Sequence, residues 1–510
     1  MRFKLPFTLG LVFVLISSVT SLFGSGVALT GHGARATALA GNFRGVANDW
    51  SAMYWNPSGI TQMQGLQFGM SLEFIKPTAN FTPAQWSYIA PAAGFVGKPD
   101  TIETAFSNMD TSKTENEPRT FLIPAFGVTY GMENLAIGFA FYVPHGLGAK
   151  WDLHNTDLYN KNYPEFDYED DLKIMDFHPT VAYELSDKLS VGLGLSIVYA
   201  DIIIKKPKYV PNPYLITKDL ANFRVGLTPL GITKPEFNHL MIDTELTGTG
   251  WGFGGNVGLL FNMTDDFKIG LSARYYNDIS IDGTINATAY FADLPAAHNA
   301  IQNNALFLNT LQGKVAAGEM TESEYGVLTN FYSGGSSVVY EDVSGDTKLP
   351  LPMEVGVGLA YTGIENLLLA ADFAWSKWSA WDVIEIDLET GEKSNLIENW
   401  DDGIRLGLGL EYTLSEQLKL RGGYYYEGSV VPDETLTPTI PDINKRSAVS
   451  FGFQFNLGPI AWHLNYEKIL IGDKTVRDYV FNAAENSYDN LAGDYGMKVD
   501  NIMTGFEYHF

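Results

Sequence analysis

Alternation of large apolar side chains with small or polar ones restricts the fold of this chain more than any other feature. Residues 66–74 place Leu, Phe, Met, Leu and Phe on one face, and Gln, Gly, Ser and Glu on the other. Residues 404–412 repeat the pattern. Because successive side chains of a strand point to opposite faces, this period predicts β-strands with one apolar face. Fourteen segments fit: 65–76, 120–131, 134–144, 172–185, 188–205, 246–263, 266–283, 351–362, 365–379, 401–413, 416–430, 446–457, 459–474 and 498–510.

The connections between these segments alternate between short and long. The long ones are 77–119, 145–171, 206–245, 284–350, 380–400, 431–445 and 475–497. Consecutive antiparallel strands therefore place all short turns at one end and all long loops at the other. An even strand number with this asymmetry is typical of outer-membrane barrels, whose short turns are periplasmic and whose long loops are extracellular.

No second sheet or helical layer is evident to cover the apolar faces, so lipid is the expected cover. Charged residues are only 18% of the chain and aromatic residues 13%. Closure into a barrel pairs every backbone group, as a membrane requires. A membrane-spanning helix needs about 20 mostly apolar residues, and the best candidate, 246–264, is interrupted by glycines. We predict an all-β fold, a 14-stranded antiparallel transmembrane β-barrel.

Composition excludes several classes of function. A net charge of −26 disfavours binding to nucleic acid phosphates, and the lack of cysteine excludes disulfides and thiolate sites. The histidines form no metal-binding pair, and the acidic run 165–171 is interpreted as a solvated loop. Residues 250–255 match G-x-G-x-x-G, but no helix follows, and a G-x-S-x-G elbow is absent from the sequence. We expect no cofactor, no metal and no enzymatic activity.

The N-terminal 64 residues differ from the rest. Residues 1–24 have basic residues, an apolar stretch and small residues, which predict a signal peptide cleaved near 24–26. Residues 27–64 do not alternate and are rich in small residues, with a breaker at Asn56-Pro57-Ser58-Gly59. Because the lumen of a large barrel is often plugged, we expect 27–64 to form a small, partly helical hatch inside a barrel of residues 65–510.

This hatch resembles that of the FadL/TodX-type outer-membrane transporters of hydrophobic compounds. The shared features are the small-residue run, Ala47-Asn48-Asp49, and Asn56-Pro57-Ser58, whose last residue is alanine in the family pattern. The resemblance implies passive transport: outer loops capture a long-chain fatty acid or hydrocarbon, the hatch at Asn56, Pro57 and Ser58 gates it, and it leaves sideways into the membrane. A kinked third strand would make the opening, and here Pro144 and Gly146 permit a kink.

Basic residues on the predicted lumen face are candidates for ligand contact. Arg274, Arg405 and Arg421 could each hold a carboxylate through two hydrogen bonds. The alternative, expected for most of them, is pairing with the lumen acids Glu354, Asp372, Glu411, Glu427 and Glu467.

The chain ends on Phe506, Tyr508 and Phe510, alternate aromatic residues that resemble the signal read by the barrel-assembly machinery. Within the loop 284–350, residues 297–317 and 322–331 are expected to form short helices over the barrel mouth. We therefore predict a monomer in the Gram-negative outer membrane whose partners are lipid, the assembly machinery and an apolar substrate. The alternatives are an adhesin or binding barrel, or a lipid hydrolase within the barrel.

Overall fold

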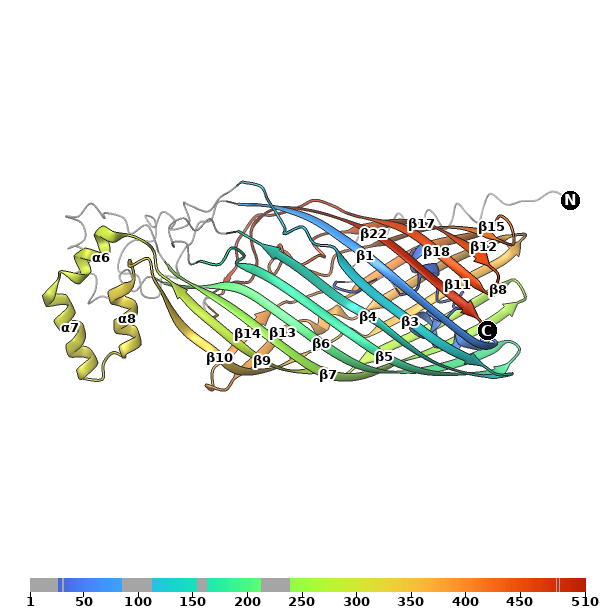
Figure 1. The fold of residues 1–510 in the computed structure, drawn as a ribbon, viewed down its shortest axis with the longest axis horizontal. Coiled ribbons are helices and arrows are strands. Elements are labelled where there is room, and N and C mark those ends of the chain that lie inside the picture. Colours follow the sequence, from blue (N-terminus) through green and yellow to red (C-terminus); the bar gives the residue numbers. More distant parts are fainter. Residues whose placement is uncertain are drawn as a thin grey trace.

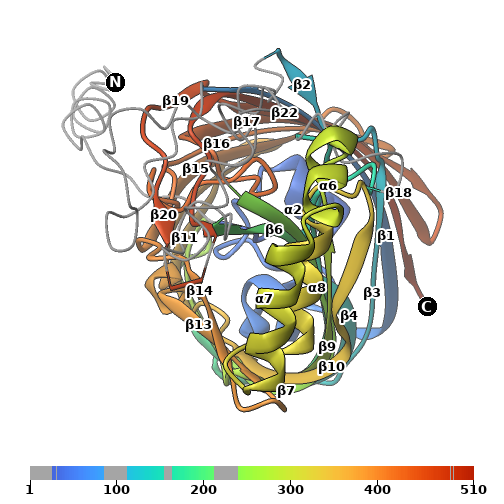
Figure 2. The same cartoon turned by 90° about the vertical axis from the view of Figure 1, so that its left-hand side faces the viewer.

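The computed structural model describes residues 26–29, 32–84, 112–153, 163–211, 239–482, 484–485 and 487–510. The predicted signal peptide lies outside them. Figure 1 shows a long barrel of tilted strands, with helices beyond one end and the C-terminus near the other. Figure 2, viewed along the barrel, shows the blue N-terminal segment inside the ring of strands.

Fourteen strands form the wall, as predicted. They are β1 (Gly65–Pro83), β3 (Phe121–Gly131), β4 (Leu135–Trp151), β5 (Tyr168–Ser186), β6 (Leu189–Pro211), β7 (His239–Thr264), β8 (Phe267–Tyr276), β11 (Glu354–Ile364), β12 (Leu367–Ser376), β15 (Gly403–Thr413), β16 (Leu418–Glu427), β17 (Arg446–Leu457), β18 (Ile460–Ile471) and β22 (Gly493–His509). Each pairs antiparallel with the next, and β22 pairs with β1 along its length, which closes the barrel.

Further strands lengthen the wall at the long-loop end. They are β9 (Ile279–Tyr290), β10 (Ser336–Leu349), β13 (Val383–Leu388) and β14 (Lys393–Ile397), and β9 pairs with both β7 and β10. The prediction of one strand over 266–283 was wrong, because this segment divides into β8 and the start of β9. The predicted loop 284–350 was also too long, because the end of β9 and all of β10 lie within it. The first half of β10 is exposed on both faces, so no alternation marked it. Short strands β2 (Thr114–Glu115), β19 (Lys474–Val476), β20 (Phe481–Asn482) and β21 (Ser487–Tyr488) lie in the loops.

The two faces of the wall have the predicted character. Large apolar side chains such as Leu195 and Phe451 are more than half exposed on the outer face, where lipid covers them in a membrane. Aromatic rings continue across neighbouring strands on this face, with Phe141 and Phe177 5.3 Å apart and Tyr199 and Trp251 4.9 Å apart. The alternate positions point inward and are mostly buried.

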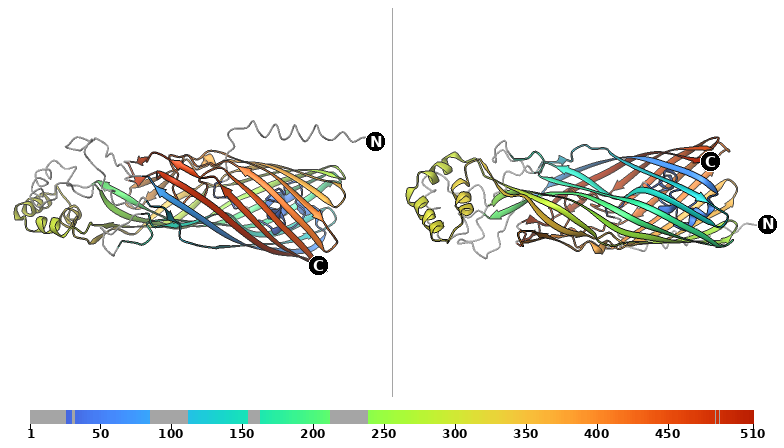
Figure 3. Two further views of the ribbon diagram at one scale, coloured as in Figure 1. Left: turned by 90° about the horizontal axis from the view of Figure 1, so that it is seen from above. Right: turned by 60° about the horizontal axis from the view of Figure 1, so that its bottom comes forward.

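Three helices lie beyond the end of the barrel that carries the long loops: α6 (Pro295–Gln302), α7 (Ala305–Ala316) and α8 (Glu322–Asn330) (Figures 1 and 3). They occupy the two segments where helices were expected. In the described part of the chain, every helix is too short or too polar to cross a membrane.

The hatch fills the lumen at the other end, close to the short turns (Figure 3). It contains two short helices, α2 (Ala34–Ala38) and α3 (Ala52–Trp55), followed by the 3-10 helix η1 (Pro57–Gln62). Above it, loops fold inward to make an apolar core around Trp378, Trp381 and Trp400, the first of which lies in the 3-10 helix η4 (Trp378–Ala380). The N-terminal plug expected from the sequence is therefore present in the lumen, and the first wall strand begins at Gly65; the domain bounds 27–64 and 65–510 stay a prediction.

Candidate functional site: a cavity beside a break in the wall

Arg44 ties the hatch to the wall by ion pairs. Its guanidinium contacts both Glu354 of β11 and Asp372 of β12, and its Nε donates to Ser272 Oγ at 3.0 Å. Burial alone would lower the pKa of Arg44, but the attraction of Asp372 and Glu354 outweighs it and raises that pKa. Arg44 therefore stays charged, and its charge is fully compensated by wall residues.

A second hatch arginine makes a similar contact with a different strand of the wall. Arg35 Nε donates to Glu411 of β15 at 2.8 Å. The lumen acids therefore pair with cations of the hatch as well as with cations of the wall.

The predicted gating residues are packed directly against the wall. Asn56 is fully buried, and its Nδ2 donates to the carbonyl of Arg44 and to that of Leu259 on β7, both at 3.0 Å. Its Oδ1 accepts from Ser58 Oγ at 2.7 Å. Pro57 is the first residue of η1. Proline suits this position, because the N–H that it lacks would have no partner within the helix. Asn56 thus connects the two halves of the hatch to one another and to the barrel.

Glycines on the lumen face make this close packing possible. A Cβ on Gly258 would lie 2.1 Å from Asn56 Oδ1, and one on Gly192 would lie 2.2 Å from the Ser58 nitrogen. On Gly270 it would lie 1.9 Å from the Arg44 carbonyl oxygen. The small residues of the lumen face therefore form the seat of the hatch.

We expect Gly270→Ala to loosen the hatch, because the added methyl group overlaps a buried backbone carbonyl. Overpacking of this kind costs about 1–3 kcal/mol. Limited proteolysis should cut residues 32–64 faster in the variant than in the wild type. Gly422→Ala is the control, since a Cβ there meets nothing closer than 3.8 Å; equal cleavage of both variants would contradict this role of Gly270.

The three predicted ligand-binding arginines already have partners. Arg274 donates to the Tyr54 carbonyl and lies 3.6 Å from the centre of the Tyr54 ring. Arg405 donates to the Ala40 carbonyl at 2.7 Å. Two of the three therefore hold hatch backbone.

Arg421 lies within the wall network. Its Nε donates to Glu411 at 2.6 Å and its Nη1 contacts His463 Nδ1 at 2.9 Å. Any of the three arginines would have to release a present partner to contact a ligand, and their ligand role stays a prediction.

The wall is interrupted between β3 and β4. Their pairing runs from Gly131↔Ala136 to Phe126↔Phe141 and stops there. Beyond that point, residues 121–125 of β3 pair with β1, and β4 pairs with β5.

The break coincides with a bulge in β4 at the predicted kink. The ladder with β5 steps from Tyr142↔Asp176 to His145↔Ile174, which leaves one extra residue on β4 beside Pro144. A bulge bends its strand and redirects it.

The first described residues cover the inner edge of this bulge. Leu29 N donates to the Pro144 carbonyl, and Gly146 N donates to the Val27 carbonyl, both at 3.0 Å. Pro144 and Gly146 thus lie together at the break, and their part in a lateral opening stays a prediction.

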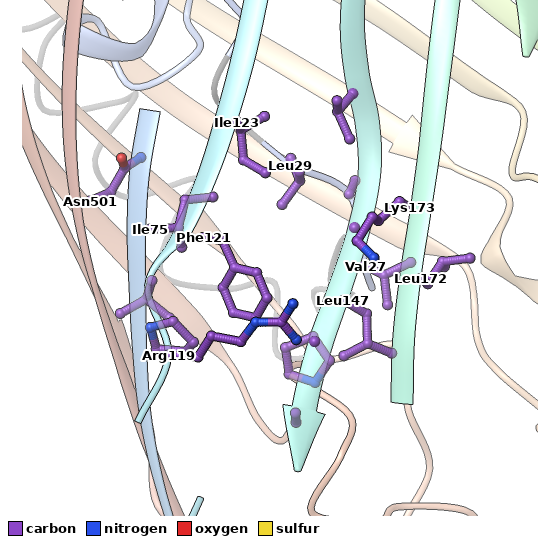
Figure 4. Close-up of a pocket in the computed structure, with 18 of the residues that line it drawn as sticks. Val27, Leu29, Ile75, Arg119, Phe121, Ile123, Leu147, Leu172, Lys173 and Asn501 are labelled. Carbon is purple, nitrogen blue, oxygen red and sulfur yellow. The ribbon is translucent and has the colours of Figure 1, made fainter. Parts of the chain in front are cut away.

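A cavity of about 400 Å³ lies at this break. Figure 4 shows apolar side chains from β1, β3, β4 and β5 around it; they include Ile75, Phe121, Ile123, Leu147 and Leu172. The lining also contains Leu122 and Pro124 from the outer face of β3, and Leu122 is 54% exposed. The cavity therefore passes through the wall to the face that lipid covers.

A smaller cavity of about 100 Å³ adjoins the first on the side of the long loops. Trp381 and Trp400 contribute to its lining, and Leu147, Leu172 and Ile440 line both cavities. The two cavities are therefore neighbours that share apolar wall and loop residues.

A family model described as "Outer membrane protein transport protein (OMPP1/FadL/TodX)" matches residues 13–510. The chain belongs to this family. It is therefore a multi-pass β-barrel of the Gram-negative outer membrane. The resemblance to FadL/TodX-type transporters, which was inferred from the hatch sequence, is confirmed.

Two named relatives are similar to this chain over most of their length. The chain is 23% identical to a long-chain fatty acid transport protein of Escherichia coli O6:H1 over 82% of this chain and 78% of that protein. It is 22% identical to outer membrane protein P1 of Haemophilus influenzae over 87% of this chain and 89% of that protein.

Two crystal structures of the family share the fold. A Pseudomonas aeruginosa FadL homologue has a TM-score of 0.69 at 15% identity and covers 95% of this chain and 99% of its own. The Pseudomonas putida toluene transporter TodX has a TM-score of 0.60 at 15% identity, with 96% and 99% covered.

Sequence reasoning missed the two hatch arginines of this family member. Arg35 and Arg44 are the only Lys or Arg residues in 27–64. Three lumen-facing acids, at Glu354, Asp372 and Glu411, were available to them. Isolated cations in a small-residue plug, facing acids in the surrounding wall, were the signal that could have found these pairs.

Proposed function

We propose that this chain carries hydrophobic molecules, long-chain fatty acids or hydrocarbons, passively across the outer membrane. The observation that carries the proposal is the apolar cavity that opens through the wall between β3 and β4. Relatives named as transporters of long-chain fatty acids and of toluene support this substrate range.

Lateral release suits such a substrate. An apolar chain loses roughly 0.8 kcal/mol for each CH₂ that passes from an apolar environment into water. A path that ends at the outer face of β3 avoids this cost, whereas a straight channel through the hatch would deliver the chain into water. The bulge at Pro144 and the bend allowed by Gly146 are proposed to keep this exit open.

The hatch is proposed to control the exit through the kinked strand. Tyr54 of α3 and Tyr142, the last residue of β4 before the bulge, make a T-shaped ring contact at 5.1 Å. His32 lies 5.5 Å from Tyr142, and burial lowers its pKa well below the ordinary value, so its ring is neutral. A shift of the hatch around Asn56, Pro57 and Ser58 would reach the bulge through these rings.

A Ser–His–Asp group on the lumen face does not support the lipid-hydrolase alternative. Ser196 Oγ donates to Asp176 at 2.8 Å and lies 3.0 Å from His178 Nδ1. A nucleophilic serine must give its proton to the histidine, with the acid on the far side of the ring. Ser196 and His178 are also buried and line neither cavity. We propose a structural role for this group and no enzymatic function.

The C-terminal aromatic residues stay a prediction of contact with the barrel-assembly machinery. Phe506 and Phe510 are exposed on β22 and just beyond it, and the rings of Tyr508 and Phe510 lie 4.5 Å apart. We retain the prediction of a monomer, because the barrel closes within one chain.

Uptake of labelled oleate and toluene tests the proposed function. Cells that lack their own transporter should accumulate one or both labels when this chain is in their outer membrane. Replacement of Asn56-Pro57 by Ala-Ala should lower uptake, because Asn56 loses its bonds to Arg44, Leu259 and Ser58. Failure of the folded, inserted wild type to take up either label would overturn the proposal.

A further inference from the structure

Two buried polar groups lie at the hatch end of the large cavity. Glu73 and Asn501 both line it and are 1% and 2% exposed. Asn501 Nδ2 donates to Glu73 Oε1. Along the lumen face of β1, Glu73 is two positions from Gly69, which packs against the hatch residue Trp50. The rest of the β1 lining, Ile75, Pro77 and Ala79, is apolar.

These two side chains present oxygens that lack a donor. Glu73 Oε2 and Asn501 Oδ1 are buried without a hydrogen-bond partner among the described residues. Within the same part of the chain, Glu73 forms no ion pair. Leaving a buried polar atom unsatisfied is costly, so a ligand that supplies a hydrogen bond here would be favoured over one that does not.

The charges next to Glu73 disfavour an anion at that end of the cavity. Each basic residue in its lining already contacts a carboxylate: Arg119 and Lys173 contact Asp171, and Arg446 contacts Glu427. Glu467, a second buried carboxyl, is directly opposite Asn501 in the β18–β22 ladder. A carboxylate ligand would place a further charge beside these two buried carboxyl groups, and burying an unpaired charge is costly.

We propose that Glu73 and Asn501 form a head-group site, and that the preferred ligand is an uncharged, mainly apolar molecule with a hydroxyl group. A hydroxyl both donates and accepts, so it satisfies the pair whichever group carries the proton, while the alkyl or aromatic body fills the apolar part of the cavity. The inference rests on the proposed function and narrows its substrate class to alcohols and phenols.

Binding of three probes with the same chain length tests the site. Labelled 1-dodecanol, dodecanoate and dodecane are equilibrated at neutral pH with the full-length mature protein in lipid nanodiscs, and binding to empty nanodiscs is subtracted. Because one unsatisfied buried group weakens binding by about tenfold or more, the wild type should bind dodecanol at least about tenfold more tightly than dodecanoate.

Two substitutions separate the head-group contact from general packing. Glu73→Leu should lower dodecanol affinity toward that of dodecane, since the carboxyl group is lost and only the Asn501 amide remains to bind the hydroxyl. Glu73→Gln keeps a polar group without charge, so dodecanol should still bind while dodecanoate binds more tightly than to the wild type. Ser71→Ala is the matched control, because Ser71 is buried on the same face of β1 but does not line the cavity.

The outcomes are distinguishable. Equal wild-type affinity for dodecanol and dodecanoate, or a ratio that neither Glu73 variant changes, would overturn the head-group site and leave hydrophobic transport standing. Binding of none of the three probes would overturn the proposed function and this inference with it. Heat-modifiable migration on gels confirms that each variant forms a folded barrel.

Discussion

Deletion of Pro144 should abolish most uptake of hydrophobic substrates while the barrel still assembles. The bulge holds one extra residue on β4 between its pairs with Asp176 and Ile174 of β5, so removing one residue restores a regular register. The straightened strand could then pair with residues 121–125 of β3. With the exit closed, the substrate would have to leave through water. Exposure of two or more of its CH₂ groups would already slow release by roughly tenfold.

Uptake of labelled oleate or toluene, corrected for the amount of folded protein, measures the effect. Pro144→Ala is the matched control, because it keeps the extra residue and should retain most of the uptake. Hydrogen exchange of the amides at 121–125 reports whether the ladder has closed. Full uptake by a deletion variant with newly protected amides would exclude the break between β3 and β4 as the exit.

The wall could be predicted from the sequence because lipid and lumen select opposite side chains at successive positions. Segments such as 404–412 carry that selection without interruption. The upper strands could not be predicted in the same way. The first half of β10 is exposed on both faces, so neither face there demands apolar residues. Where such an exposed strand stops depends on whether a neighbouring strand continues the hydrogen-bonded ladder. For β10 that neighbour is β9.

The candidate site was predicted in part. Pro144 and Gly146 were proposed for the exit because proline and glycine interrupt a ladder visibly in sequence, and β4 does have a bulge beside Pro144. The alternation also assigned Arg274 and Arg405 to the lumen, but it could not show that hatch carbonyls hold them. Those contacts join residues more than 200 positions apart. Glu73 looked like any polar lumen residue, and only the cavity distinguishes it.

The hatch should open when Arg44 is replaced by methionine. Methionine keeps an apolar stem but leaves the Asp372 side chain, which is 7% exposed, and the partly exposed Glu354 without their cation. Loss of one partner of a buried ion pair costs about 3–5 kcal/mol. The barrel itself should survive, since its ladders do not involve Arg44. We expect large channel openings in planar bilayers and entry of bulky hydrophilic antibiotics into cells, both absent in the wild type.

Two controls separate the lost anchor from a general loss of stability. Lys468→Met removes an ion pair with Asp500 in which both side chains are about one-third exposed, and pairs of that kind contribute little; this variant should stay closed. Adding Glu354→Gln and Asp372→Asn to Arg44→Met removes the unpaired charges and should restore much of the closure. An Arg44→Met barrel that stays closed would instead mean that packing of the hatch against the lumen glycines holds it without the ion pairs.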